Sequence, residues 1–159
     1  MEYSYINYKQ KKFIYAFNED KLAYFGTGDL PALEKIFSDD RFVYVEDLQT
    51  NFIQEIKDYF EGNLKVFKTP LYFSGTEFQK EVYKYLAKVP YGSLVSYTEL
   101  AHMMQSPNKV RAIANALGKN KHLILLPCHR VIAKDGSLGG FSGGLDLKVI
   151  LHDIESIKL

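Results

Sequence analysis

One thiol in the chain has neighbours that could turn it into a nucleophile. Cys128 is the only cysteine, and it lies in the stretch Leu125–Val131, which reads LLPCHRV. A thiol is a strong nucleophile only as a thiolate, so a base or a positive charge must lower its pKa. His129 and Arg130 follow directly and are candidates for this role. Because adjacent side chains do not normally face each other, a bend after Pro127 or a bridging water would be needed.

A lone cysteine behind an apolar run is more commonly an inert core residue. The run Leu123–Leu126 is wholly apolar and predicts a buried strand that ends beside the thiol. A single cysteine excludes an internal disulfide and a cysteine-rich zinc site, and it fits a reduced intracellular compartment. His102, His122 and His152 show no metal-ligand spacing, so we expect no catalytic metal and no cofactor. We expect His152 on the polar side of the last helix.

The composition is that of a globular chain with an uneven charge distribution. The 159 residues are 47% hydrophobic and 25% charged, which is enough for one or two small cores. No stretch resembles a signal peptide or is long enough to cross a membrane, so we expect a soluble, cytosolic protein. The formal net charge of +1 hides a segment, Leu100–Lys134, with six basic residues and no acidic one. This segment either contacts phosphates or forms a solvated face.

The elements of the first half predict a small α/β unit without catalytic residues. Loose alternation of apolar and polar residues, rich in aromatics, predicts strands over residues 3–8, 13–18, 21–26 and 41–48. A short helix is expected over Leu30–Phe37. A second helix is expected from Asn51 as its N-cap, with Gln54 completing a capping box, to a stop at Gly62.

The second half is expected to be mostly helical. Ser74 and Glu77 have the spacing of a capping box and predict a helix through residue 89. Ser96 and Glu99 predict a second box, which opens a short helix through residue 104. Next, Ser106 is expected to cap a helix that has proline at its first position. Together these last two helices predict a helix-turn-helix.

The second helix of this pair has two distinct faces. At 100° per residue the expected buried stripe consists of Val110, Ile113, Ala114 and Leu117. The opposite face is small and polar, and it consists of Asn108, Arg111, Ala112, Asn115 and Lys119. Without bulky side chains, the helix backbone can approach a grooved partner closely. An ordinary amphipathic helix would show the same pattern.

Four stretches together resemble the O6-alkylguanine-DNA alkyltransferases. The core PCHR of residues 127–130 is similar to their active-site motif. VPYGSLVSYTELA (89–101) and KVRAIANALGKN (109–120) are similar to their helix-turn-helix, and GSLGGFSGGLDLK (136–148) to their substrate loop. The resemblance covers residues 78–155. The first 70 residues fit only in length and in the order of strands and helices.

The resemblance implies a role for each matching residue of the active site. Cys128 would accept the alkyl group, and His129 would be its base, acting through a buried water. Glu155, at the edge of the apolar stripe of the last helix, would orient the histidine. Asn120 would brace the active-site turn. Tyr97 would donate a hydrogen bond near the flipped nucleotide.

The resemblance also implies a DNA surface and a substrate pocket. Arg111 would enter the base stack and fill the gap left by the flipped base. The other residues expected to contact DNA are Ala112, Asn115, Lys109, Lys119 and Arg130. The residues expected in the substrate pocket are Val131, Ser142 and Gly143. This chain departs from the family where Lys121 replaces a frequent proline, Asn115 a frequent glycine, and Phe141 a frequent tyrosine.

We therefore expect an α+β protein with two domains. Residues 1–70 would form an N-terminal α/β, ribonuclease H-like domain with an antiparallel sheet. Residues 74–159 would form the mainly helical alkyltransferase domain with the helix-turn-helix and the PCHR site. The expected partner is double-stranded DNA that contains O6-alkylguanine, bound by a monomer with no membrane contact. Whether O4-alkylthymine is also accepted stays open.

Two other classes of function compete with this expectation. The first is a DNA-damage-binding or regulatory protein in which Cys128 is only packed. The second is a hydrolytic enzyme with a Cys-His-Glu triad. The stoichiometry of the thiol separates all three, because a hydrolase turns over, an alkyltransferase is modified once and a binding protein is not modified.

Overall fold

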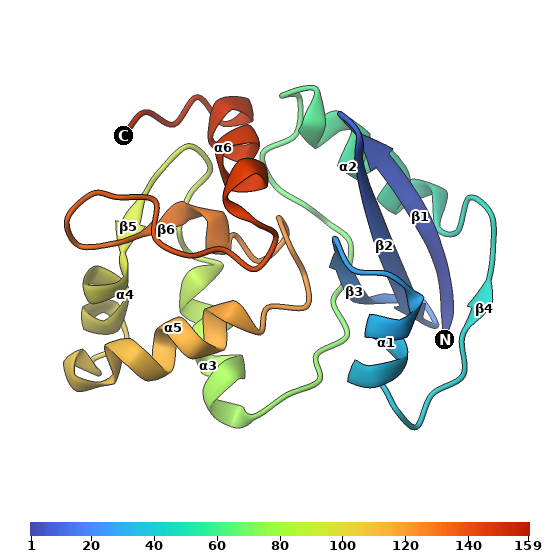
Figure 1. Cartoon of the computed structure of the whole chain (residues 1–159), viewed down its shortest axis with the longest axis horizontal. Helices are drawn as coiled ribbons and strands as arrows, with labels where there is room; N and C mark the ends of the chain where they lie inside the picture. Colours follow the sequence, from blue (N-terminus) through green and yellow to red (C-terminus); the bar gives the residue numbers. More distant parts are fainter. The chain divides into compact units, whose positions relative to one another are not determined.

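The computed structural model describes residues 1–159, which divide into two compact units, Met1–Ser74 and Gly75–Leu159. The first unit contains a four-stranded sheet with two helices, and the second is mainly helical, as Figure 1 shows. The predicted α+β class is therefore confirmed. None of the helices combines the length and the apolar character needed to span a membrane.

The sheet of the first unit is built around one long antiparallel meander. Its strands are β1 (Glu2–Tyr8), β2 (Lys11–Asn18), β3 (Lys21–Gly26) and β4 (Val43–Tyr44), in the spatial order β3-β2-β1-β4. β1 and β3 both pair antiparallel with β2, while β4 runs parallel to β1. The strand predicted over residues 41–48 is wrong in extent. Only two of its residues pair with β1, and their side chains are exposed at the edge of the sheet.

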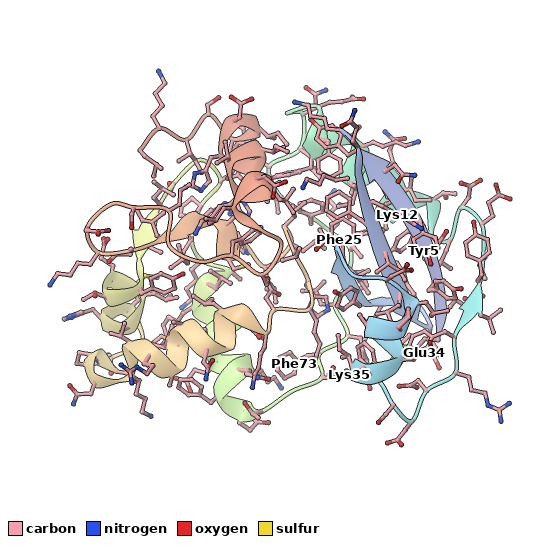
Figure 2. All side chains as sticks on the ribbon, in the orientation of Figure 1. Tyr5, Lys12, Phe25, Glu34, Lys35 and Phe73 are labelled. Carbon is pink, nitrogen blue, oxygen red and sulfur yellow. The ribbon has the colours of Figure 1, made fainter.

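Both faces of this sheet are buried, one under each helix of the unit. The five residues from Phe13 to Phe17 in the central strand β2 are buried. On one face, α1 (Leu30–Ile36) packs its Leu33 against the sheet. On the other face, α2 (Thr50–Phe60) packs Phe52 against the strand aromatics. Figure 2 labels Tyr5 and Lys12 on neighbouring strands, where the Lys12 ammonium lies 4.0 Å from the centre of the Tyr5 ring.

The start of α2 differs from the predicted cap, whereas its end is confirmed. The N-cap is Gln49, in a left-handed conformation, and Asn51 is already inside the helix. The side chain of Gln54 donates to Asp58 one turn later instead of reaching back to the helix start. Gly62 ends the helix with a φ of 79°, which glycine adopts without strain.

One capping box of the second unit lies two residues from its predicted place. α3 (Glu77–Leu86) is capped by Thr76, whose hydroxyl accepts from the backbone N–H of Gln79 at 3.1 Å. The predicted pair of Ser74 and Glu77 does not cap it. α4 (Tyr97–Met103) has the expected box, in which Ser96 and Glu99 bond each other's backbone N–H groups at 3.0 Å.

The helix-turn-helix is present, but its second helix starts later than expected. A 3₁₀ turn, η1 (Pro107–Lys109), precedes α5 (Val110–Gly118). The Ser106 hydroxyl does not cap this helix, because it donates to the carbonyl of Met104 at 3.2 Å. Pro107 therefore begins the 3₁₀ turn instead of the α-helix.

The remaining elements of the second unit surround the PCHR stretch. The 3₁₀ turn η2 (Cys128–Arg130) leads into β6 (Val131–Ile132), which pairs in parallel with β5 (Val95–Ser96). Since β5 leads directly into α4, this pairing joins the helix-turn-helix to the thiol turn. A loop then leads to α6 (Leu145–Ile154), which contacts η2.

Candidate active site

The thiol lies at the start of a tight turn and not at the end of a strand. The predicted strand Leu123–Leu126 is wrong: the segment is a series of turns in which Ile124 has a φ of 75°. Such a conformation is rare for a β-branched residue. The side chain of Asn120 makes hydrogen bonds to this backbone that a neighbouring strand would otherwise make. Its Nδ2 donates to the Leu126 carbonyl at 2.8 Å, and its Oδ1 accepts from the backbone N–H of His122 at 2.9 Å. Asn120 thus holds the backbone of this turn through two side-chain hydrogen bonds.

Cys128 is a buried, protonated thiol. Only 6% of the residue is exposed, and Nδ2 of Asn120 lies 3.2 Å from Sγ. Burial raises the pKa of the thiol to about 11, against the opposing effects of the Asn120 hydrogen bond and the Lys148 charge. The surroundings therefore do not lower the pKa of the resting thiol as the basic segment suggested. A thiolate must form by proton transfer at the moment of reaction.

His129 and Glu155 form a buried pair beside the thiol. Nε2 of His129 lies 2.5 Å from Oε2 of Glu155, and neither side chain is exposed. Because a carboxylate only accepts, Nε2 carries the proton of the neutral ring. Nδ1, which is also buried, then carries the lone pair that can take up a thiol proton.

Burial and pairing set the protonation states of His129 and Glu155 so that His129 can act as a base. Burial lowers the pKa of His129, although the hydrogen bond to Glu155 and its negative charge act in the opposite direction. Burial alone would raise the pKa of Glu155, but hydrogen bonds from His129 and Arg130 outweigh it and hold the pKa well below its usual range. At neutral pH the imidazole is therefore uncharged and the carboxylate is ionised.

Arg130 belongs to this buried set and not to the exposed face that was predicted to contact DNA. Its Nε donates to Oε1 of Glu155 at 2.8 Å, and its Nη1 donates to the carbonyl of Val89 at 2.8 Å. The backbone N–H of Gly92 adds a further hydrogen bond to the same carboxylate at 3.0 Å. With 7% of the residue exposed, the prediction that Arg130 contacts DNA is wrong. Its charge neutralises Glu155 instead.

Cys128 forms part of the wall of a cavity of about 470 Å³. Its lining comes from the thiol turn, from α4 and α5 and from the loop before α6, and consists of Tyr97, Ala114, Leu117, Gly118, Cys128, Gly140, Phe141 and Ser142. Tyr97 and Ser142 therefore lie on the walls of a space that also contains Cys128. Val131 does not, because it is fully buried in β6. Gly143 does not line the cavity either. A side chain there would meet Phe141 and Leu147 at 2.8 Å, so glycine allows the loop to pack closely.

Lys148 holds the loop in place, a role that was not predicted from the sequence. It is fully buried, and its Nζ donates to the carbonyls of Val131 at 2.7 Å, Leu138 at 2.5 Å and Gly140 at 3.1 Å. Burial lowers its pKa to about 8, while the nearby Cys128 acts to raise it. The available signal was a lysine directly beside Leu147 in the apolar stripe of the last helix.

The face of α5 predicted to meet DNA is exposed. Arg111, Ala112, Asn115 and Lys119 are exposed, as is Lys109 in the turn before the helix. The buried stripe differs from the prediction in two members. Ile113 and Leu117 are buried as predicted and Ala116 joins them, whereas Val110 and Ala114 are only half-buried and Ala114 lines the cavity. One helix therefore presents an exposed, basic face and also a wall of the cavity that Cys128 lines.

Comparison with known proteins agrees with this geometry. Residues 77–157 match the family described as 6-O-methylguanine DNA methyltransferase, DNA binding domain. The inducible methylated-DNA–protein-cysteine methyltransferase of Bacillus subtilis is 36% identical over 96% of this chain and 89% of its own length. The enzyme of the same name from Methanosarcina mazei is 42% identical over 66% of each chain. The crystal structure of Mycobacterium tuberculosis OGT in complex with DNA superposes with a TM-score of 0.88 at 30% identity, over 98% of this chain and 92% of that one. The chain belongs to the 6-O-methylguanine DNA methyltransferase family.

Proposed function

We propose that this protein repairs DNA by taking the alkyl group of O6-alkylguanine onto Cys128, once and irreversibly. The observation that carries the proposal is a buried thiol in the wall of a cavity, directly before His129, which is paired with Glu155. A reduced thiol is required, which favours the cytoplasm as its place of action.

The chemistry follows from the states of these groups. The thiol proton of Cys128 passes to Nδ1 of His129, through a water because side chains of adjacent residues do not normally face each other. Sγ attacks the alkyl carbon in line, the bond between that carbon and O6 breaks, and its electron pair stays on the guanine oxygen. The imidazolium formed on His129 is stabilised by the Glu155 carboxylate at 2.5 Å. A thioether does not hydrolyse readily, so the protein is consumed.

Access to a guanine inside a duplex requires that the base leaves the stack. We propose that the exposed face of α5 enters the minor groove, where the small side chains of Ala112 and Asn115 permit close approach. Lys109 and Lys119 contact phosphates, which carry no sequence information. The alkylated base then flips into the cavity beside Tyr97, at a cost of a few kcal/mol, while Arg111 fills its place in the stack.

Mass measurement tests the proposal directly. After incubation with duplex DNA that contains O6-methylguanine, one methyl group should be found on the protein, at Cys128, for each lesion repaired. Continued turnover would instead identify a hydrolase. Repaired DNA alongside an unmodified Cys128 would also contradict the mechanism.

Replacement of Arg111 by alanine should separate base flipping from chemistry. The variant should react with free O6-benzylguanine at nearly the normal rate, because a free base needs no flipping. On duplex DNA its rate should fall by about 10- to 100-fold, since nothing fills the gap in the stack. Lys119→Ala, which removes a charge from the same face, is the matched control and should only weaken affinity. Equal losses on both substrates would mean that Arg111 is not the residue that replaces the base.

The transfer rate should depend on pH through His129 and not through free ionisation of the thiol. The rate should be flat around neutral pH, because the thiol stays protonated up to its pKa of about 11 and the proton acceptor is neutral. It should fall at acid pH with a midpoint below the ordinary histidine pKa of 6.5, since burial lowers the pKa of His129. Single-turnover rates from pH 5 to 9 measure this. A rate that rises tenfold per pH unit above neutrality would show that a freely formed thiolate attacks.

A further inference from the structure

One polar side chain of α6, that of His152, contacts the thiol turn but has no part in the reaction described above. The sequence placed His152 on the polar side of this helix, but only 5% of the residue is exposed. Its Nε2 lies 2.6 Å from the carbonyl oxygen of His129. A carbonyl oxygen only accepts, so Nε2 of His152 carries a proton and donates it. A buried donor on the backbone of the proposed base is therefore available to position that base.

Three polar side chains of α6 and its C-cap lie on the side of the helix that contacts this region. Lys148, His152 and Glu155 are spaced four and three residues apart, which places them on one side of the helix. Lys148 donates to the carbonyl of Val131, and Glu155 accepts from the imidazole of His129. Between them, His152 binds the main chain of His129 itself.

We infer that His152 is a positioning residue for alkyl transfer, an inference that rests on the proposed function. Glu155 fixes the far end of the His129 ring, and His152 fixes the backbone from which that ring projects. With both ends held, the residue cannot turn about its own Cα–Cβ bond. Since Cys128 and His129 are adjacent in the chain, the path from Sγ to Nδ1 depends on how the His129 ring is oriented.

Two substitutions at His152 separate hydrogen bonding from packing. His152→Leu removes the donor while it fills the space, and His152→Gln retains an N–H donor. The leucine variant should lose about tenfold in the transfer rate at saturating DNA, as expected for one lost positioning contact. The DNA concentration for half-maximal rate should stay unchanged, because α5 is untouched. The glutamine variant should recover most of the rate. Leu151→Val, a packing loss next to His152 on the same helix, is the control and should keep the normal rate.

A spectroscopic measurement tests the positioning without any substrate. The proton between Nε2 of His129 and Glu155 is in a short, buried hydrogen bond and should give a strongly downfield proton resonance. It should shift or broaden in His152→Leu and remain in place in His152→Gln and Leu151→Val. An unshifted resonance in folded His152→Leu would overturn the inference even if the protein transferred no alkyl group. A glutamine variant as slow as the leucine variant would overturn it as well.

Discussion

The Cys128→Ala protein is expected to transfer no alkyl group while it binds alkylated duplex DNA as tightly as the unchanged chain. The substitution removes the only thiol, so no second acceptor exists. It leaves the exposed face of α5 and most of the cavity wall intact, because Cys128 is one of eight residues that line the cavity. The loss in rate should be complete within detection. Mass spectrometry of the protein and a fluorescence titration of labelled duplex measure the two quantities.

The control for this experiment is the free energy of unfolding of the Cys128→Ala variant. Removal of a small buried sulfur should cost about 1–2 kcal/mol in the free energy of unfolding, which leaves the chain folded. A methyl group found on any other residue would contradict the assignment of the acceptor. Loss of DNA binding in a variant with normal stability would mean that the thiol contributes to binding.

Glu155→Gln should be the most damaging substitution among the residues that do not touch substrate. The carboxylate accepts from the His129 ring, from Arg130 and from the backbone of Gly92. A glutamine offers one oxygen and turns an NH₂ group towards these donors. The Arg130 charge then lies buried without its counter-ion, which should cost about 3–5 kcal/mol of stability. The rate should fall by about 100- to 1,000-fold, because the imidazolium formed during transfer loses its stabilising charge.

The pH dependence of stability provides an independent check on Glu155. Its pKa in the folded protein lies below the ordinary value of 4.5, so the stabilisation is complete above pH 4.5 and is lost as the pH falls through the folded pKa. The free energy of unfolding should therefore decline in acid for the unchanged chain and decline less for Glu155→Gln. Asp153→Asn changes an exposed carboxylate on the same helix and should match the unchanged chain. Equal acid sensitivity in all three proteins would show that Glu155 contributes nothing to it.

Features that depend on neighbouring residues could be predicted from the sequence. The box of Ser96 and Glu99 and the stop at Gly62 are set by local hydrogen bonds and by backbone preference, and both are present. The two faces of α5 follow from helical periodicity alone. The box at Ser74 was wrong because Thr76, two residues later, offers the same chemistry with Gln79.

Features that depend on which side chains meet in the folded chain could not be predicted from periodicity and composition. The run Leu123–Leu126 has the composition of a strand, but the amide of Asn120 holds it as a series of turns. Arg130 was placed on the DNA surface because it lies in a basic segment, whereas its partner, Glu155, is 25 residues further along the chain. The same holds for Lys148 and His152, whose burial is decided by how α6 lies on the thiol turn and the loop.

The burial of Cys128 also determines how long the protein stays usable before it meets a lesion. Oxidants react with the thiolate form of exposed cysteines. A cysteine is therefore oxidised more easily when it is more exposed and when its pKa is lower. This thiol is 6% exposed and has a pKa raised to about 11, so it presents almost no thiolate to peroxide or to other disulfides. An acceptor that can be used only once is thus held in its inert, protonated form.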